Sequence, residues 1–198
     1  MVRDRTELIQ LMEDVLLALL PKKEQQNEWV AGGLGLLRGV AVRFWDEFPE
    51  HCTLPHILAF IMPASARQLS LFLQQHLVSE MLAGAYLKAE GSEKTQASYL
   101  STLCYNLATL SQNEEIAYVL SGDDFDFNLI DPETPKLFAV SNNFSKNSVY
   151  APGISMLMTI SARQFSMQNR VPFVYFLDEM TTVNIKNFEP LPSVLREY

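Results

Sequence analysis

Apolar side chains recur every three or four positions over most of the first 120 residues, which is the spacing of amphipathic helices. Between residues 3 and 20 the apolar positions fall on one stripe with charged residues opposite: Leu8, Leu11, Val15, Leu16, Leu19 and Leu20. A second helix is predicted from about residue 24 to 48. Because it is apolar almost all round from Trp29 to Val42, we expect it to be central and buried.

Shorter helices are predicted beyond this central one. Thr53 followed by Leu54-Pro55 has the pattern of an N-cap with proline in the first helical turn, and that helix is expected to end near Pro63. Ser65 opens a further helix that is predicted to run to about residue 88. Two more helical segments follow, at residues 95–110 and 113–120.

The pattern changes after Ser121-Gly122, where aspartates and prolines become frequent. Lys136–Ser141 is predicted to be a strand, and residues 150–167 a helix. Val171–Leu177 is a nearly continuous apolar run of the length and kind expected of a strand buried on both faces. We therefore predict a mixed, mainly α chain: an all-helical domain over residues 1–120 and an α/β segment over residues 121–198.

Composition narrows the class of protein. Hydrophobic residues make up 48% and charged residues 19% of the 198 residues, which excludes a disordered chain. No run of 18 apolar residues is present, so we expect no membrane-spanning helix. A net charge of −8 argues against a stand-alone nucleic-acid binder. The two cysteines, Cys52 and Cys104, are expected to be free thiols.

The surrounding sequence argues against several candidate binding sites. Four glycines between residues 32 and 39 suggest a phosphate-binding loop, but they lie inside a helical pattern without a following Lys-Ser or Lys-Thr, which favours close helix packing. His51, Cys52 and His56 have the residue types of metal ligands, yet His76, the remaining histidine, falls in another helix, so we expect a loop-edge cluster without metal.

Two further patterns are also incomplete. Asp124 opens a sequence similar to a calcium loop, but Leu129 and Pro135 replace the required glycine and glutamate, so a solvated turn is the better interpretation. Three serines are candidate nucleophiles by residue type, but none lies in a nucleophile-elbow context: Ser101, Ser111 and Ser155.

One chemical pattern remains. The apolar segment Phe173–Leu177 leads directly into Asp178-Glu179. In nucleotide hydrolases an aspartate at the end of a buried strand helps to hold Mg²⁺, and an adjacent glutamate orients or deprotonates the attacking water. An apolar strand followed by Asp-Glu also arises by chance, so the pattern gains weight only from its context.

The sequence from Phe173 to Tyr198, FVYFLDEMTTVNIKNFEPLPSVLREY, resembles the region after the second nucleotide motif (Walker B) of TraG/TraD-like coupling proteins of bacterial conjugation and type IV secretion. Residues 121–141 look like that family's re-entry from its helical domain into the central sheet. The resemblance implies an all-α domain followed by a partial RecA-like α/β motor segment. The order of the domains resembles the family over the whole chain, whereas sequence motifs resemble it only over about the last 80 residues.

By this resemblance Asp178 is the Mg²⁺-side carboxylate of a bound nucleotide and Glu179 the catalytic one. Arg196 falls where the family carries an arginine that reaches a neighbouring subunit's nucleotide. An ordinary helix salt bridge beside Glu197 is the alternative role for Arg196. Two positions depart from the family pattern, since Met180 replaces a common aromatic and Asn184 a frequent glycine.

A larger departure concerns ATP binding. The chain contains no Gly-x-x-x-x-Gly-Lys-[Ser/Thr] loop (Walker A) and no counterpart of the family's membrane helices. We therefore expect a fragment of a homo-hexameric P-loop ATPase, which would need ATP and Mg²⁺ as a full-length protein at the cytoplasmic face of the bacterial inner membrane. The fragment itself is expected to bind no cofactor and to be inactive alone.

The resemblance implies that the parent protein delivers a relaxase–DNA substrate to a type IV secretion channel during conjugation or plasmid mobilization. Relaxosome proteins, the channel and DNA are the partners that it implies. The alternative is a helical protein-recognition module, residues 1–120, that binds a relaxase or accessory protein without catalytic activity. A small unrelated α/β enzyme is a third reading, although the sequence contains no complete catalytic set.

Overall fold

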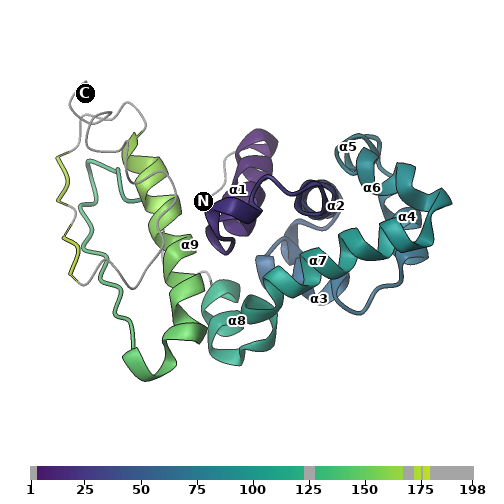
Figure 1. The fold of residues 1–198 in the computed structure, drawn as a ribbon. Coiled ribbons are helices and arrows are strands. Elements are labelled where there is room, and N and C mark those ends of the chain that lie inside the picture. The colour runs from purple at the N-terminus through teal and green to yellow at the C-terminus, as the bar shows by residue number, and fades with distance from the viewer. Residues whose placement is uncertain (1–3, 123–127, 167–171, 175, 179–198) are drawn as a thin grey trace. The chain divides into compact units, whose positions relative to one another are not determined.

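The computed structural model describes residues 4–122, 128–166, 172–174 and 176–178 (Figure 1). Within these residues the chain is mainly helical and contains no β-strand. The chain divides into two compact units, a helical unit of residues 2–122 and a second unit that begins at residue 123. The mainly α class predicted from the periodicity is therefore confirmed.

The first two helices of the helical unit begin at side-chain caps. Helix α1 (Arg5–Ala18) starts after Asp4, whose carboxylate accepts a hydrogen bond of 2.8 Å from the backbone N–H of Glu7. A single 3-10 turn, Lys22–Glu24, then leads to α2 (Glu28–Glu47), which the side chain of Asn27 caps. The apolar stripe of α1 packs against α2, and six of its side chains are buried: Leu8, Met12, Val15, Leu16, Leu17 and Ala18.

Helix α2 is the centre of the helical unit. It packs against α1 and against each of the helices from α3 to α7. Its middle is buried on all sides, as the continuous apolar sequence predicted, and several of its side chains have no exposed surface at all: Leu36, Leu37, Val40, Ala41 and Val42. Helices α1 and α3 to α7 therefore surround one largely apolar central helix.

Between residues 49 and 91 the chain forms short helices rather than long ones. A 3-10 turn (Pro49–His51) leads to α3 (Leu54–Ile61), which is capped by Thr53 as predicted. The helix expected over residues 65–88 is instead divided into α4 (Ala66–Gln74), α5 (Leu77–Leu82) and α6 (Gly84–Lys88), with a 3-10 turn at Ala89–Gly91.

The physical reason for this correction lies at His76. Its backbone is extended, with φ −136° and ψ 115°, and its side chain caps α5. The resulting bend ends α4 and brings α5 against the central helix, where Ser79 and Ala83 are fully buried. Local helix propensity is thus overridden by packing against α2.

Two helices complete the helical unit. Helix α7 (Glu93–Gln112) spans the region predicted at residues 95–110 and packs against α2. Helix α8 (Glu114–Ser121) begins after Asn113, whose side chain accepts a hydrogen bond from the backbone N–H of Ile116. Helix α8 packs against both α3 and α7.

The second unit contains one long helix, α9 (Asn147–Ser166), which follows a 3-10 turn at Phe144–Lys146. This agrees with the helix predicted at residues 150–167. The strand predicted at Lys136–Ser141 is not formed, because those residues have irregular backbone and pair with no strand among the described residues. The backbone N–H of Leu129 donates to Gln164 of α9 at 3.1 Å, and the Lys136 ammonium donates to the carbonyl of Asn128 at 3.0 Å.

Candidate functional site

The apolar segment before Asp178 is not a buried strand in the described residues. Phe173, Val174, Phe176 and Leu177 have irregular backbone, and the side chains of Val174 and Phe176 are 91% and 87% exposed. Val171 and Tyr175 lie outside the described residues. The strand prediction for this segment is therefore not met at the positions that the structure describes.

Of the three residues assigned catalytic or metal-binding roles by resemblance, only Asp178 is described. It lies in a bend and is exposed. Glu179 and Arg196 lie outside the described residues, so their predicted roles stay predictions.

The glycines of α2 serve helix packing, as their helical context predicted. A Cβ atom at Gly32 would overlap the ring of Tyr99 in α7, and one at Gly33 would lie 3.1 Å from the Cβ of Leu103. A Cβ at Gly35 would lie 2.9 Å from the carbonyl oxygen of Leu82 in α5. A Cβ at Gly39 would meet the Ser79 carbonyl oxygen at 2.8 Å. Neighbouring helices therefore approach α2 where side chains are absent.

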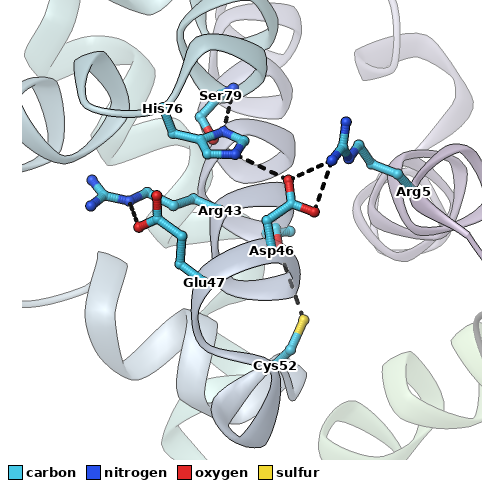
Figure 2. Close-up of polar contacts among 8 residues, drawn as sticks. Arg5, Arg43, Asp46, Glu47, Cys52, His76 and Ser79 are labelled. Carbon is cyan, nitrogen blue, oxygen red and sulfur yellow. Dashed lines mark hydrogen bonds and ion pairs between the residues drawn. The ribbon is translucent and has the colours of Figure 1, made fainter.

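A polar cluster that the sequence patterns did not indicate lies at the C-terminal end of α2 (Figure 2). Two side chains contact the carboxylate of Asp46 there. Arg5 of α1 approaches its carboxylate to 2.9 Å, and the Nε2 atom of His76 lies 3.1 Å from Oδ2. The cluster thus connects the beginning of α1, the end of α2 and the bend between α4 and α5. We call these residues, together with Ser79, the Asp46 cluster.

The hydrogen bonds of His76 fix its tautomer. The backbone N–H of Ser79 donates to Nδ1 at 3.3 Å, so Nδ1 acts as an acceptor. The hydroxyl of Ser79 also lies 3.0 Å from Nδ1. In a neutral ring the proton is therefore on Nε2, the nitrogen that lies 3.1 Å from Oδ2 of Asp46. His76 caps α5 with one nitrogen and binds the end of α2 with the other.

The Asp46 cluster has the residue types of a hydrolytic triad but not its accessibility. Ser79 has no exposed surface, so its hydroxyl group cannot meet a substrate carbonyl. The Nδ1 atom facing that hydroxyl is already an acceptor for a backbone N–H, which competes with a role as general base. The arrangement is explained by helix capping and helix–helix attachment.

Other buried polar groups near the end of α2 are also paired within the fold. Arg43 is only 8% exposed; its Nε donates to Glu47 at 2.7 Å, and its Nη1 donates to the carbonyl of Phe72. The guanidinium carbon lies 4.1 Å from the centre of the Phe72 ring, so a cation–π contact adds to the attachment of α4.

Both cysteines are free thiols, as predicted. The thiol of Cys52 lies 3.9 Å from the carbonyl oxygen of Ala41 (Figure 2). Burial, and then the charge of Asp46, raise the pKa of the Cys52 thiol. Burial likewise raises the pKa of Cys104. A raised pKa lowers the thiolate fraction at neutral pH, so neither cysteine has the character of an activated nucleophile.

The histidine and aspartate groups considered as metal ligands form local contacts. The rings of His51 and His56 are 5.4 Å apart, and Nδ1 of His56 lies 2.7 Å from the hydroxyl of Thr53. In the described part of the chain, no three histidine, cysteine, aspartate or glutamate side chains gather closely enough to hold a metal ion. Asp131 lies in a turn, where it accepts hydrogen bonds from the Glu133 backbone and the Thr134 hydroxyl.

No protein-family model, curated protein or solved structure gives a significant match to the chain. Across the described residues, every helix is too short or too polar to cross a membrane.

Proposed function

We propose that this chain is part of a TraG/TraD-like coupling ATPase of conjugation or type IV secretion, namely its helical domain and a partial RecA-like motor segment. One observation carries the proposal. A helical unit of residues 2–122 is followed by a separate unit in which an apolar segment leads into Asp178-Glu179. That order matches a helical domain inserted before the second nucleotide motif of such a motor.

The roles in this proposal follow the nucleotide chemistry. Asp178 holds the Mg²⁺ of bound ATP, Glu179 activates the attacking water, and Arg196 reaches the nucleotide of a neighbouring subunit in a hexamer. The phosphate-binding loop is contributed by another part of a longer parent chain, because the present sequence contains none. The parent would act at the cytoplasmic face of the inner membrane, on a relaxase–DNA substrate.

Two measurements test the proposal. Isothermal titration calorimetry of the 198-residue chain with Mg-ATP should show no micromolar binding, because the backbone donors and lysine that hold the β- and γ-phosphates are missing. Micromolar affinity would contradict the assignment of the ATP site to a longer parent. The genomic reading frame around Met1 should in turn encode a glycine-rich Lys-Ser/Thr loop upstream; stop codons there would also contradict it.

A mating assay tests the catalytic role in that parent. Glu179→Gln keeps the size and polarity of the side chain but removes the carboxylate, so we expect DNA transfer to fall by about two orders of magnitude or more. Glu80→Gln is the matched control, because Glu80 is an exposed glutamate of α5 in the helical unit. If DNA transfer with Glu179→Gln were undiminished at normal protein levels, the result would contradict the proposal that the parent protein is an ATPase with Glu179 as a catalytic residue.

A further inference from the structure

His76 makes two contacts that place opposite demands on the charge of its ring (Figure 2). Its Nδ1 atom accepts a hydrogen bond of 3.3 Å from the backbone N–H of Ser79, and its Nε2 atom lies 3.1 Å from Oδ2 of Asp46. Only the neutral ring has a nitrogen that can accept, because both ring nitrogens of a protonated histidine are donors. The contact with Ser79 therefore requires a neutral ring, whereas a positive ring strengthens the contact with Asp46.

Protonation of the ring would leave the backbone N–H of Ser79 without its acceptor. A proton taken from solvent at Nδ1 occupies the lone pair that receives this hydrogen bond, so two N–H groups would then face each other. The hydroxyl of Ser79, 3.0 Å from Nδ1, can accept the new proton. Because Ser79 has no exposed surface, water reaches its backbone N–H only if the first turn of α5 moves.

Helix α5 depends strongly on this cap because it has only six residues, Leu77–Leu82. The first backbone N–H groups of any helix have no partner within it, and the side chain of His76 satisfies one of them. The other end of α5 is held by packing, since Ala83 is fully buried and lies against Gly39 of the central helix. Loss of the cap therefore loosens the first turn of α5 and leaves its last turn in place.

Charged groups around the ring come from several helices. Those drawn around His76 in Figure 2 are Arg5 of α1 and three residues of α2: Arg43, Asp46 and Glu47. Arg43 and Glu47 pair with each other at 2.7 Å, so Asp46 and its partner Arg5 are the charges next to the ring. The charged residues of the two flanking helices are Arg67, in the first turn of α4, and the exposed Glu80 of α5.

We propose that His76 is a pH-sensitive switch of the α5 cap. With a neutral ring, Nδ1 caps the first turn of α5 and Nε2 lies against Asp46. Uptake of a proton from solvent at Nδ1 ends the cap, while the ring stays at Asp46 as the positive partner of an ion pair. The first turn of α5 then opens, and the end of α2 remains attached to the bend after α4. The switch does not depend on the motor assignment.

Hydrogen exchange of the intact chain, observed by NMR at about pH 7.5 and about pH 5, tests the switch. Histidine is the side chain whose charge changes in this range. After correction for intrinsic exchange rates, protection of the Ser79 amide should fall about fivefold or more at the lower pH, as expected for the loss of a helix cap. The fall is measured relative to the amide of Val40 in the middle of α2, which separates local opening from unfolding of the whole chain.

Two matched variants assign the effect to one ring. In His76→Asn the side chain can accept from the Ser79 N–H at either pH, so protection of the Ser79 amide should be the same at both. His56→Asn is the control, because His56 is an exposed histidine of α3. This control should keep the pH-dependent loss of the unaltered chain.

The ring nitrogens can be observed directly in the unaltered chain. At about pH 7.5 the ¹⁵N chemical shifts of His76 should show an unprotonated Nδ1 and a protonated Nε2, and both should be protonated after acidification. The midpoint of this change should coincide with the midpoint of the loss of Ser79 protection. This comparison needs no variant, so it decides the matter even if His76→Asn does not fold.

Any of four results would overturn the switch. The first is equal protection of the Ser79 amide at the two pH values, and the second is a loss in His76→Asn as large as in the unaltered chain. The third is a proton on Nδ1 of His76 at about pH 7.5, and the fourth is a loss of Ser79 protection whose midpoint differs from that of the ring.

Discussion

Gly39 of the central helix lies directly against the carbonyl oxygen of Ser79 in α5. A Cβ atom at position 39 would be 2.8 Å from that oxygen and 3.1 Å from the Cβ of Ala83. Backbone cannot move aside as the end of a flexible side chain can. The absence of a side chain at Gly39 therefore allows α5 to pack on α2. The position of the segment from α4 to α6 depends on this one glycine.

Gly39→Ala should destabilise the protein by about 1–3 kcal/mol, because the added methyl group forces α5 away from α2. Guanidinium denaturation followed by circular dichroism measures the change. Gly84→Ala is the control: a Cβ at Gly84 meets nothing within 4 Å, so this variant should be unchanged or slightly more stable. If Gly39→Ala were as stable as Gly84→Ala, the close approach of α5 would not be required for the fold.

The role of these glycines could be predicted from the sequence, whereas the bend at His76 could not. Four glycines inside an apolar helical pattern indicate close packing, because the pattern excludes a phosphate loop. At residues 65–88 the periodicity suggests one helix. The chain bends there because burial of Ser79 and Ala83 against α2 outweighs local propensity, and that contact joins residues about 40 positions apart.

His76→Ala should cost about 1–2 kcal/mol of stability, because it removes the cap of α5 and the polar contact with Asp46 together. His76→Asn should cost less, since an asparagine side chain can still accept from the Ser79 backbone. Denaturant unfolding at pH 7 compares the two. His56→Ala, at an exposed histidine of α3, should change stability by less than about 0.5 kcal/mol.

Equal losses in His76→Ala and His76→Asn would show that capping contributes nothing at this bend. A loss in His56→Ala as large as that in His76→Ala would show that the effect is not specific to the Asp46 cluster.

The Asp46 cluster was missed from the sequence for a physical reason. Arg5, Asp46 and His76 have no mutual spacing that marks them, and only tertiary packing brings three helix ends together. By contrast, Asp178-Glu179 is conspicuous in sequence because both carboxylates are adjacent. Sequence patterns therefore find sites built from one segment more readily than clusters built from several.

Tyr86→Phe should leave the protein equally stable or more stable at pH 7, by up to about 1–2 kcal/mol. The Tyr86 hydroxyl is buried and has no hydrogen-bond partner among the residues that the structure describes, so its removal relieves an uncompensated desolvation cost. Thermal or denaturant unfolding of both proteins measures the difference. A loss of more than 1 kcal/mol would show that the hydroxyl is paired in solution.

The same variant should change the response to alkali. Burial, followed by the charges of Cys104 and Glu90, raises the pKa of Tyr86 to about 12. A raised folded-state pKa gives stability that is present below the unfolded value near 10 and is lost as the pH rises towards the folded value. The unaltered protein should therefore lose more stability between about pH 10 and pH 12 than Tyr86→Phe does. If the stability of the two proteins fell equally with pH, the pKa of Tyr86 would not differ between the folded and unfolded states.

Thr134→Val should raise the pKa of Asp131 towards its usual range. The hydrogen bond from the Thr134 hydroxyl, and then that from the Glu133 backbone, lower the pKa of this carboxyl. A lowered folded-state pKa gives stabilisation that is present above the unfolded value and lost as the pH falls through the folded one, so the turn loosens only in acid. Carboxyl ¹³C chemical shifts across pH 2–6 report the titration. Because valine keeps the shape of threonine without its hydroxyl, an unchanged Asp131 titration in Thr134→Val would show that the side-chain hydrogen bond does not hold the turn in solution.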